Sequence, residues 1–322
     1  MTMFRISSPD IAARQGVPPV SKGAPPFWVV VDNFADLAAV FSWEEAAAAI
    51  EWLCGRIASL PGLIVCEVDI REDGARVAVI RSVVALGQSY SDILIAVGQK
   101  VFQCGGEPVV LALSAQPFLA ELELRVSAFP GGYGRDCWIE DMRVAVSVHE
   151  AIQENRLFLL CQPVVSPPEG GRVLYHGCLA WILERGGGVV LSPGQFVPAL
   201  ERLGLTRLFD VAVMRDVLER LRSSPEICLG CKVSALSAVN DLWWQDVQQM
   251  LLLDPGLASR LVIEVTETVG FPNAPRAQTF IESFRRMGCW TATDNFGAGC
   301  NSSPTMMRTK PDPIKIDTRL VP

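Results

Sequence analysis

The stretch LVIEVTE at residues 261–267 sets the pattern of the second half of the chain, because it is an apolar run that ends in polar side chains. Similar runs predict strands, and helical stretches lie between most of them. The predicted strands cover residues 156–165, 173–182, 227–234, 261–266, 289–294 and 312–317. Nearly continuous apolar strands that alternate with helices indicate parallel strands covered by helices. A (β/α) barrel and an open doubly wound sheet both fit this alternation.

The start of one helix in this half is well marked. Ser192-Pro193-Gly194-Gln195 places a serine at the N-cap, a proline at the first helical position and a glutamine at the third. This arrangement satisfies backbone N–H groups that the first turn of a helix leaves without a partner. We therefore expect a helix to begin at Pro193.

The first half predicts a separate and smaller domain. Residues 1–26 end in a Pro-rich run and predict a flexible leader. Residues 27–134 predict a small α/β domain, which ends in a cluster of proline and glycine at residues 130–134. The larger α/β domain then covers residues 140–322. The helices and strands expected ahead of it are helices at 36–60, 89–102 and 140–154 and strands at 63–70 and 108–114.

Composition excludes several classes of protein. Half of the 322 residues are apolar and a fifth are charged, so the chain can bury a sizeable core and is not a disordered tail. The net charge of −7 argues against a nucleic-acid polymer as partner. No uncharged apolar stretch reaches the ~18 residues of a membrane span, and the first residues lack a signal peptide. We expect a cytoplasmic protein.

Charged side chains follow three of the predicted strands. Glu264 and Asp294 lie at or near the ends of two strands, and Lys315 lies between two isoleucines in a third. Carboxylates that converge from separate strands can hold a hard divalent cation, and a lysine could help to deprotonate a bound water. The three residues therefore form a candidate metal-assisted hydrolytic cluster. The alternative is that each acid caps a strand end or pairs with a neighbouring base.

Five motifs in the second half occur in a familiar order. They are LLCQPVV at 159–165, LSPGQFVP at 191–198, EVTE at 264–267, DNFGAG at 294–299 and IKID at 314–317. From about Asn155 to its end, the chain resembles the EAL family, which comprises the cyclic di-GMP phosphodiesterases and their inactive relatives. The resemblance implies a (β/α) barrel. It also implies that Glu264 and Asp294 are metal ligands, that Lys315 lies beside the catalytic water and that Glu267 holds the loop after Asp294.

The chain departs from the family at four positions of the site. Where the family has Glu-Ala-Leu-Leu-Arg-Trp, residues 176–181 read HGCLAW, so His176 replaces a metal-binding glutamate and Ala180 replaces a phosphate-contacting arginine. Ala235 stands where the family has a ligand asparagine, and Asn295 replaces the second acid of its Asp-Asp pair. Histidine is a poor substitute for oxygen at magnesium, and too few carboxylates are left for two dications. Efficient hydrolysis is therefore not expected.

The sequence stops just after the sixth strand of the family, at Pro322. Six strands would leave a barrel incomplete, without its last two strand–helix units. The missing wall would come from the N-terminal domain, a protein partner or a second copy of the chain, or else the chain is a shortened product of poor stability.

The N-terminal domain faintly resembles a degenerate diguanylate-cyclase-like (GGDEF) domain, and Gly105-Gly106-Glu107 invites that comparison. A generic α/β sensor or interaction domain is the alternative. For the whole chain we expect a catalytically inactive regulatory or scaffold protein of cyclic di-GMP signalling, with cyclic di-GMP as a candidate ligand. The alternatives are a phosphodiesterase with residual activity, dependent on Mg²⁺ or Mn²⁺, and a protein-interaction module that binds no nucleotide.

Overall fold

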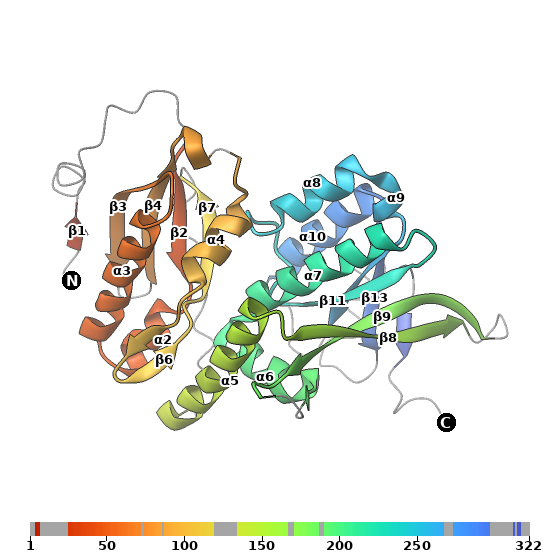
Figure 1. The fold of residues 1–322 in the computed structure, drawn as a ribbon, viewed down its shortest axis with the longest axis horizontal. Coiled ribbons are helices and arrows are strands. Elements are labelled where there is room, and N and C mark those ends of the chain that lie inside the picture. The colour runs from red at the N-terminus through yellow and green to blue at the C-terminus, as the bar shows by residue number, and fades with distance from the viewer. Residues whose placement is uncertain are drawn as a thin grey trace. The chain divides into compact units, whose positions relative to one another are not determined.

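Separate β-sheets organise the two halves of the chain (Figure 1). The computed structural model describes residues 4–6, 25–71, 74–85, 87–118, 134–166, 171–186, 190–266, 273–296, 312 and 314–316. The N-terminal unit contains Met1–Ser147, Arg202–Gly204 and Asp241–Trp243. The C-terminal unit contains Val148–Glu201, Leu205–Asn240 and Trp244–Pro322. Within the described ranges, no helix is long and apolar enough to cross a membrane.

The N-terminal unit is an antiparallel sheet with helices packed on it. Its five strands follow the order β1-β3-β4-β2-β7. They are β1 (Phe4–Ile6), β2 (Phe27–Val31), β3 (Leu63–Arg71), β4 (Gly74–Arg81) and β7 (Leu113–Pro117). The other elements are α2 (Phe34–Val40), α3 (Trp43–Ala58), the short η1 (Val83–Ala85), α4 (Tyr90–Gly98), β5 (Phe102–Cys104), β6 (Glu107–Val109) and α5 (Arg135–Gln153). Strand β2 lies between β4 and β7 and is buried along its whole length.

Two expectations for this unit are corrected. The helix expected over residues 36–60 is two helices, because the chain leaves α2 at Phe41 and Ser42 then caps α3 by accepting a hydrogen bond from the Glu45 amide. The strand expected over 108–114 is also two elements, β6 and β7. Of the predicted leader, residues 4–6 form β1 and pair with β3, whereas residues 7–24 lie outside the described residues.

The glycine pair of this unit lies in the turn of the β5–β6 hairpin, between two strands and not simply ahead of one. Gly105 and Gly106 have φ angles of 56° and 83°, a conformation that favours glycine. A Cβ on Gly105 would also lie 2.7 Å from Cδ1 of Phe41. The turn therefore requires glycine at its first position for two independent reasons.

The C-terminal unit is built on a seven-stranded mixed sheet. Strands β10-β9-β11-β12-β13-β14 lie in that order, and β8 pairs with β9. They are β8 (Leu157–Ser166), β9 (Arg172–Leu183), β10 (Val190–Leu191), β11 (Leu229–Ser234), β12 (Leu261–Thr266), β13 (Trp290–Phe296) and β14 (Ile314–Ile316). Its helices after α5 are α6 (Pro193–Leu203), α7 (Thr206–Ser223), α8 (Gln245–Leu253), α9 (Pro255–Ala258) and α10 (Ala274–Arg286).

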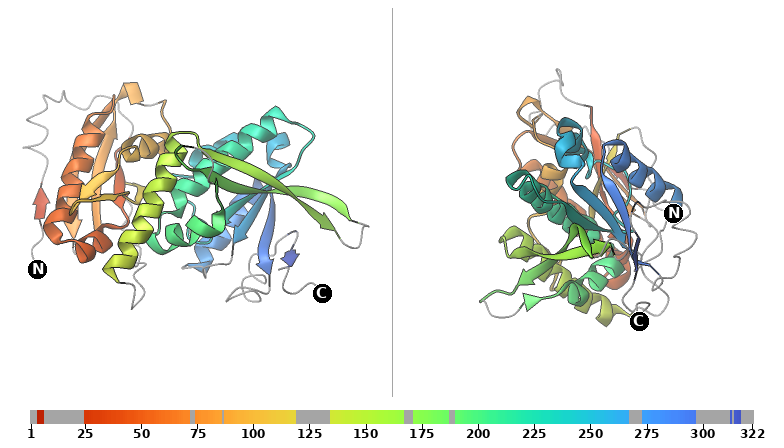
Figure 2. Two further views of the ribbon diagram at one scale, coloured as in Figure 1. Left: turned by 60° about the horizontal axis from the view of Figure 1, so that its bottom comes forward. Right: turned by 90° about the vertical axis from the view of Figure 1, so that its right-hand side faces the viewer.

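The expectation of an all-parallel sheet is wrong for two strands. Strands β8 and β10 run antiparallel to β9, whereas β9, β11, β12, β13 and β14 are parallel neighbours. The physical reason is the short connection between β8 and β9, since a parallel pair needs a crossover of a dozen residues or more. The two strands form the long ribbon that Figure 2 shows in green.

The order of the parallel strands distinguishes the two architectures that the sequence left open. From β9 to β14 they follow one another in chain order, with α7 packed against β11 and α10 against β13. A doubly wound sheet would reverse its strand order at a switch point. The C-terminal unit is thus a partial (β/α) barrel in the residues that the structure describes, and the α/β class expected from the sequence is confirmed.

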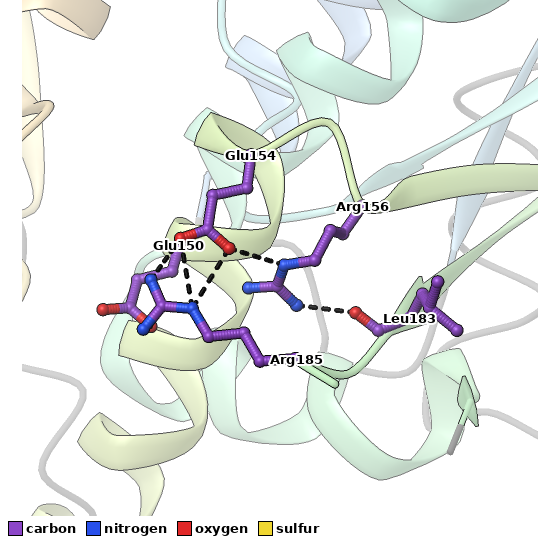
Figure 3. A network of polar contacts seen from close by, with 5 residues as sticks. All are labelled: Glu150, Glu154, Arg156, Leu183 and Arg185. Carbon is purple, nitrogen blue, oxygen red and sulfur yellow. Dashed lines mark hydrogen bonds and ion pairs between the residues drawn. The ribbon is translucent and has the colours of Figure 1, made fainter. Parts of the chain in front are cut away.

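Polar contacts fix the ends of the C-terminal elements. As expected, α6 begins at Pro193, and the Gln195 side chain accepts a hydrogen bond from the Ser192 amide at 2.8 Å. Just after α5, Glu154 accepts hydrogen bonds from Arg156 and Arg185, while Arg156 donates to the carbonyl of Leu183 (Figure 3). This network ties the end of α5 to both strands of the β8–β9 ribbon.

Candidate functional site

Two buried carboxylates lie on adjacent parallel strands of the C-terminal unit. Glu264 on β12 has no solvent exposure, and Asp294 on β13 is 2% exposed. Alternation along each strand puts Glu264 on the same face as Val262 and Asp294 on the same face as Ala292. Because Val262 and Ala292 pack in one cluster with Tyr175 of β9, both carboxylates belong to that face. We call it the Glu264 face.

A lysine that sequence reasoning missed lies on the same face. Lys232 of β11 is in register with Glu264, and its Nζ is 2.5 Å from Oδ2 of Asp294. The lysine side chain is 31% exposed and that of Asp294 is 3% exposed. The ammonium thus reaches from β11 to a carboxylate on β13, with β12 and Glu264 between them. A signal was present in the sequence, since a lone lysine in the strand LGCKVS needs a partner for its charge.

Tyr175 and Gly230 pack closely around Glu264. Tyr175 is 3% exposed, and burial together with the neighbouring Glu264 carboxylate raises its pKa, so the phenol stays neutral. A Cβ on Gly230 would lie 2.6 Å from Oε1 of Glu264 and 2.6 Å from Cε2 of Tyr175. Glycine at this position of β11 is what lets the tyrosine ring and the carboxylate pack so closely.

The structure does not bring His176 to the carboxylates. Tyr175 occupies the Glu264 face, and neighbouring residues of a strand point to opposite faces. His176 is partly buried on the other face, which it shares with Cys178. A tyrosine and not the histidine therefore stands beside Glu264 on β9.

The remaining predicted positions divide into two groups. Ala180 and Ala235 are 6% and 2% exposed, and Ala180 shares the strand face of His176. Lys315 lies in β14, which pairs with β13, but its side chain and that of Asn295 lie outside the described residues. Glu267 lies outside the described residues altogether. The structure thus shows Glu264 and Asp294 on one face, whereas the side chains of Lys315 and Glu267 lie outside the residues it describes.

A second polar cluster lies behind the end of β11. The Ser234 amide donates to Oδ2 of Asp210 at 3.1 Å, and the Ser234 hydroxyl donates to Oε1 of Glu201 at 3.1 Å. Asp210 is buried on α7, and this burial raises its pKa to about 7. These contacts hold the carboxyl end of β11 against α6 and α7.

A divalent cation does not fit these side chains as they stand. A metal on Asp294 would meet the ammonium of Lys232, which already contacts that carboxylate. Across the ranges that the structure describes, no group of three or more histidine, cysteine, aspartate or glutamate side chains could hold a metal ion. These side chains therefore do not support the metal-assisted hydrolytic step that the family resemblance implies.

Comparison with known proteins identifies the family of the C-terminal half of the chain. The EAL domain family model matches residues 145–322. Cyclic di-GMP phosphodiesterase PdeF of Escherichia coli is 26% identical over 174 residues, which are 53% of this chain and 23% of PdeF. The bifunctional diguanylate cyclase/cyclic di-GMP phosphodiesterase MucR of Pseudomonas aeruginosa is 26% identical over 183 residues, 55% of this chain and 26% of MucR.

The matched segment is thus about a quarter of the length of each of these relatives. Among solved structures, the S helix-GGDEF-EAL segment of Vibrio cholerae LapD bound to c-di-GMP is 17% identical, with a TM-score of 0.48, over 91% of this chain and 75% of that one. Because the family model covers more than half of the 322 residues, the chain belongs to the EAL domain family.

Proposed function

We propose that this chain is a protein of cyclic di-GMP signalling that acts as a regulator or scaffold and does not cleave the nucleotide. A place in cyclic di-GMP signalling is supported by membership of the EAL domain family and by similarity to MucR and PdeF, which are named for cyclic di-GMP enzymes. The observation that supports the absence of hydrolysis is the ion pair of Lys232 with Asp294. It places a positive charge on one of the two carboxylates that the family resemblance assigns to a metal.

The substitutions read from the sequence point in the same direction. By the family motifs Ala180 and Ala235 offer no side-chain donor or ligand where the family has an arginine and an asparagine, and on β9 Ala180 lies on the strand face opposite Glu264. An arginine supplies a planar fork for a phosphate group, and alanine cannot replace it. Cleavage of a phosphodiester needs the complete charge constellation, whereas binding does not. Binding without hydrolysis is therefore the activity that these residues favour.

Nucleotide chromatography tests the absence of hydrolysis. The full chain is incubated with cyclic di-GMP and Mn²⁺, with PdeF as a positive control. We expect no linear product from this chain. A product peak that Glu264→Ala abolishes, and that the matched change Glu282→Ala on α10 leaves intact, would overturn the proposal and support the residual phosphodiesterase.

Calorimetry with cyclic di-GMP tests the binding. We expect a saturable heat from the full chain, because a regulator of this class must recognise the nucleotide. An absence of heat at high nucleotide concentration would favour the interaction module that binds no nucleotide. The two assays thus separate the three functions that the sequence left open.

Several further expectations stay predictions. They are the cytoplasmic location, the degenerate GGDEF-like character of the N-terminal domain, the part of Lys315 beside a water and the loop contact of Glu267. Self-association of the chain is tested by light scattering, which would give more than the 35.1 kDa of one chain.

A further inference from the structure

Lys232 contacts the Asp294 carboxylate and lies level with Glu264, so it brings a positive charge to the Glu264 face. It is level with Glu264 in the β11–β12 register, and Thr266 in turn is level with Asp294 in the β12–β13 register. To reach Asp294, the lysine side chain must cross the strand that carries Glu264. Its ammonium is therefore a cation held at the Asp294 carboxylate, on the face that also carries Glu264, and it needs no ion from solution.

The surroundings make such a cation necessary. Glu264 and Asp294 are almost completely buried, and the face they share carries an apolar cluster that includes Val262 and Ala292. Two like charges in an apolar setting are strongly unfavourable unless a positive charge accompanies them. An ammonium and a divalent cation cannot share the Asp294 carboxylate without strong mutual repulsion. The lysine therefore supplies one positive charge, at Asp294, and keeps a dication away from that carboxylate.

We propose that Lys232 is a resident cation that takes the place of a divalent metal in this barrel, so that the Asp294 carboxylate is neutralised by the chain itself and the Glu264–Asp294 pair is closed to Mg²⁺ and Mn²⁺. The inference deepens the proposed function and rests on it only for the assignment of this face as the family site. Residue 232 is thus a determinant of cation specificity, and its charge decides whether the carboxylate pair accepts a metal ion.

The test measures Mn²⁺ binding by the full chain, using the electron paramagnetic resonance signal of free Mn²⁺ and the thermal unfolding midpoint. Wild type should bind no stoichiometric Mn²⁺, and its midpoint should not change with the metal. Lys232→Met, which removes the charge and keeps most of the stem, should bind Mn²⁺ at least about tenfold more tightly than wild type. Its midpoint should be lower than that of wild type in chelator and should rise when Mn²⁺ is added.

Three further proteins make the result specific. Lys100→Met removes an exposed lysine of the N-terminal unit and should behave as wild type. Lys232→Arg keeps the cation and should also exclude Mn²⁺. Lys232→Met combined with Asp294→Asn should lose the Mn²⁺ binding that the single change creates.

Two outcomes would overturn the inference. One is stoichiometric Mn²⁺ binding by wild type that Asp294→Asn abolishes, a measurement that needs no folded Lys232 variant. The other is a folded Lys232→Met protein that binds Mn²⁺ no more tightly than wild type. If wild type binds Mn²⁺ but does not hydrolyse cyclic di-GMP, only the inference about Lys232 is refuted. Hydrolysis of cyclic di-GMP would instead refute the proposed function.

Discussion

Replacing Gly230 with alanine tests the packing that holds Glu264 in place. The added Cβ would lie 2.6 Å from Oε1 of Glu264, and 2.6 Å and 3.0 Å from Cε2 and Cδ2 of Tyr175. Carbon atoms pack comfortably at ~3.5–4.0 Å, so the ring must retreat by about 1 Å. Both neighbours are buried, with exposures of 0% and 3%, and neither can move freely into solvent.

The expected cost follows from two opposing effects. Overpacking a well-packed interior typically destabilises a protein by about 1–3 kcal/mol. Removing a glycine from a strand interior returns about 0.5–1 kcal/mol, because alanine has less backbone freedom to lose on folding. Gly230→Ala should therefore lower the free energy of unfolding by about 1–2 kcal/mol, a net figure combining both effects.

Urea denaturation of the full chain, followed by far-ultraviolet circular dichroism, measures the loss. Gly194→Ala is the matched control, since the same change in α6 places a Cβ 4.0 Å from its nearest neighbour, Oγ of Ser192. That control should stabilise the protein by up to about 1 kcal/mol, because alanine is the better helix former. If Gly230→Ala proves as stable as wild type, the close approach of Tyr175 and Glu264 is not a feature of the folded protein.

Two further changes test the polar contacts of the C-terminal unit. Burial raises the pKa of Asp210 from an ordinary value of 3.8 to about 7. Between these two pH values the folded protein keeps a proton that the unfolded chain loses. The free energy of unfolding should therefore fall by about 1.4 kcal/mol for each unit by which the pH rises from 3.8 to 7. Asp210→Asn should remove this slope in urea denaturation, and equal slopes would contradict the burial argument. Hydrogen bonds from Arg185 and, to a smaller extent, Arg156 lower the pKa of exposed Glu154 from 4.5 to about 2. The stabilisation of the folded state by Glu154 is therefore present above pH 4.5 and is lost as the pH falls toward 2. Glu154→Gln should lower Tm slightly at neutral pH, and high salt should remove the difference from wild type. A large loss of Tm that does not depend on salt would contradict a role through exposed ion pairs.

The strands of the C-terminal unit could be predicted well from the sequence because their apolar runs are long and sharply bounded. Strand β12 occupies residues 261–266, as expected, and β8 and β9 lie within a residue or so of theirs. Their direction could not be read from periodicity, since an apolar run has the same pattern in either orientation. The short stretch between the runs at 156–165 and 173–182 was a usable signal, because it cannot hold a crossover helix.

The candidate site was harder to predict than the fold. A motif match assigns His176 to a ligand position by its place along the sequence. Which face a strand residue occupies depends on the pairing of that strand, and here the pairing puts Tyr175 beside Glu264. Lys232 was missed for a different reason. Sequence reasoning searched the ends of strands, whereas this lysine acts from a strand interior across its neighbour.

The charge of residue 232 bears more directly on the chemistry of this barrel than the number of family motifs that survive. A dication on Asp294 and an ammonium on the same carboxylate would lie roughly 4 Å apart. Their repulsion would be about 8 kcal/mol at the effective dielectric constant of ~20 that suits a protein surface. That is comparable to the free energy that holds many whole domains folded. A barrel can therefore keep both acids on one sheet face, as this one does with Glu264 and Asp294, and we expect it to exclude a metal ion when a lysine from β11 pairs with one of them.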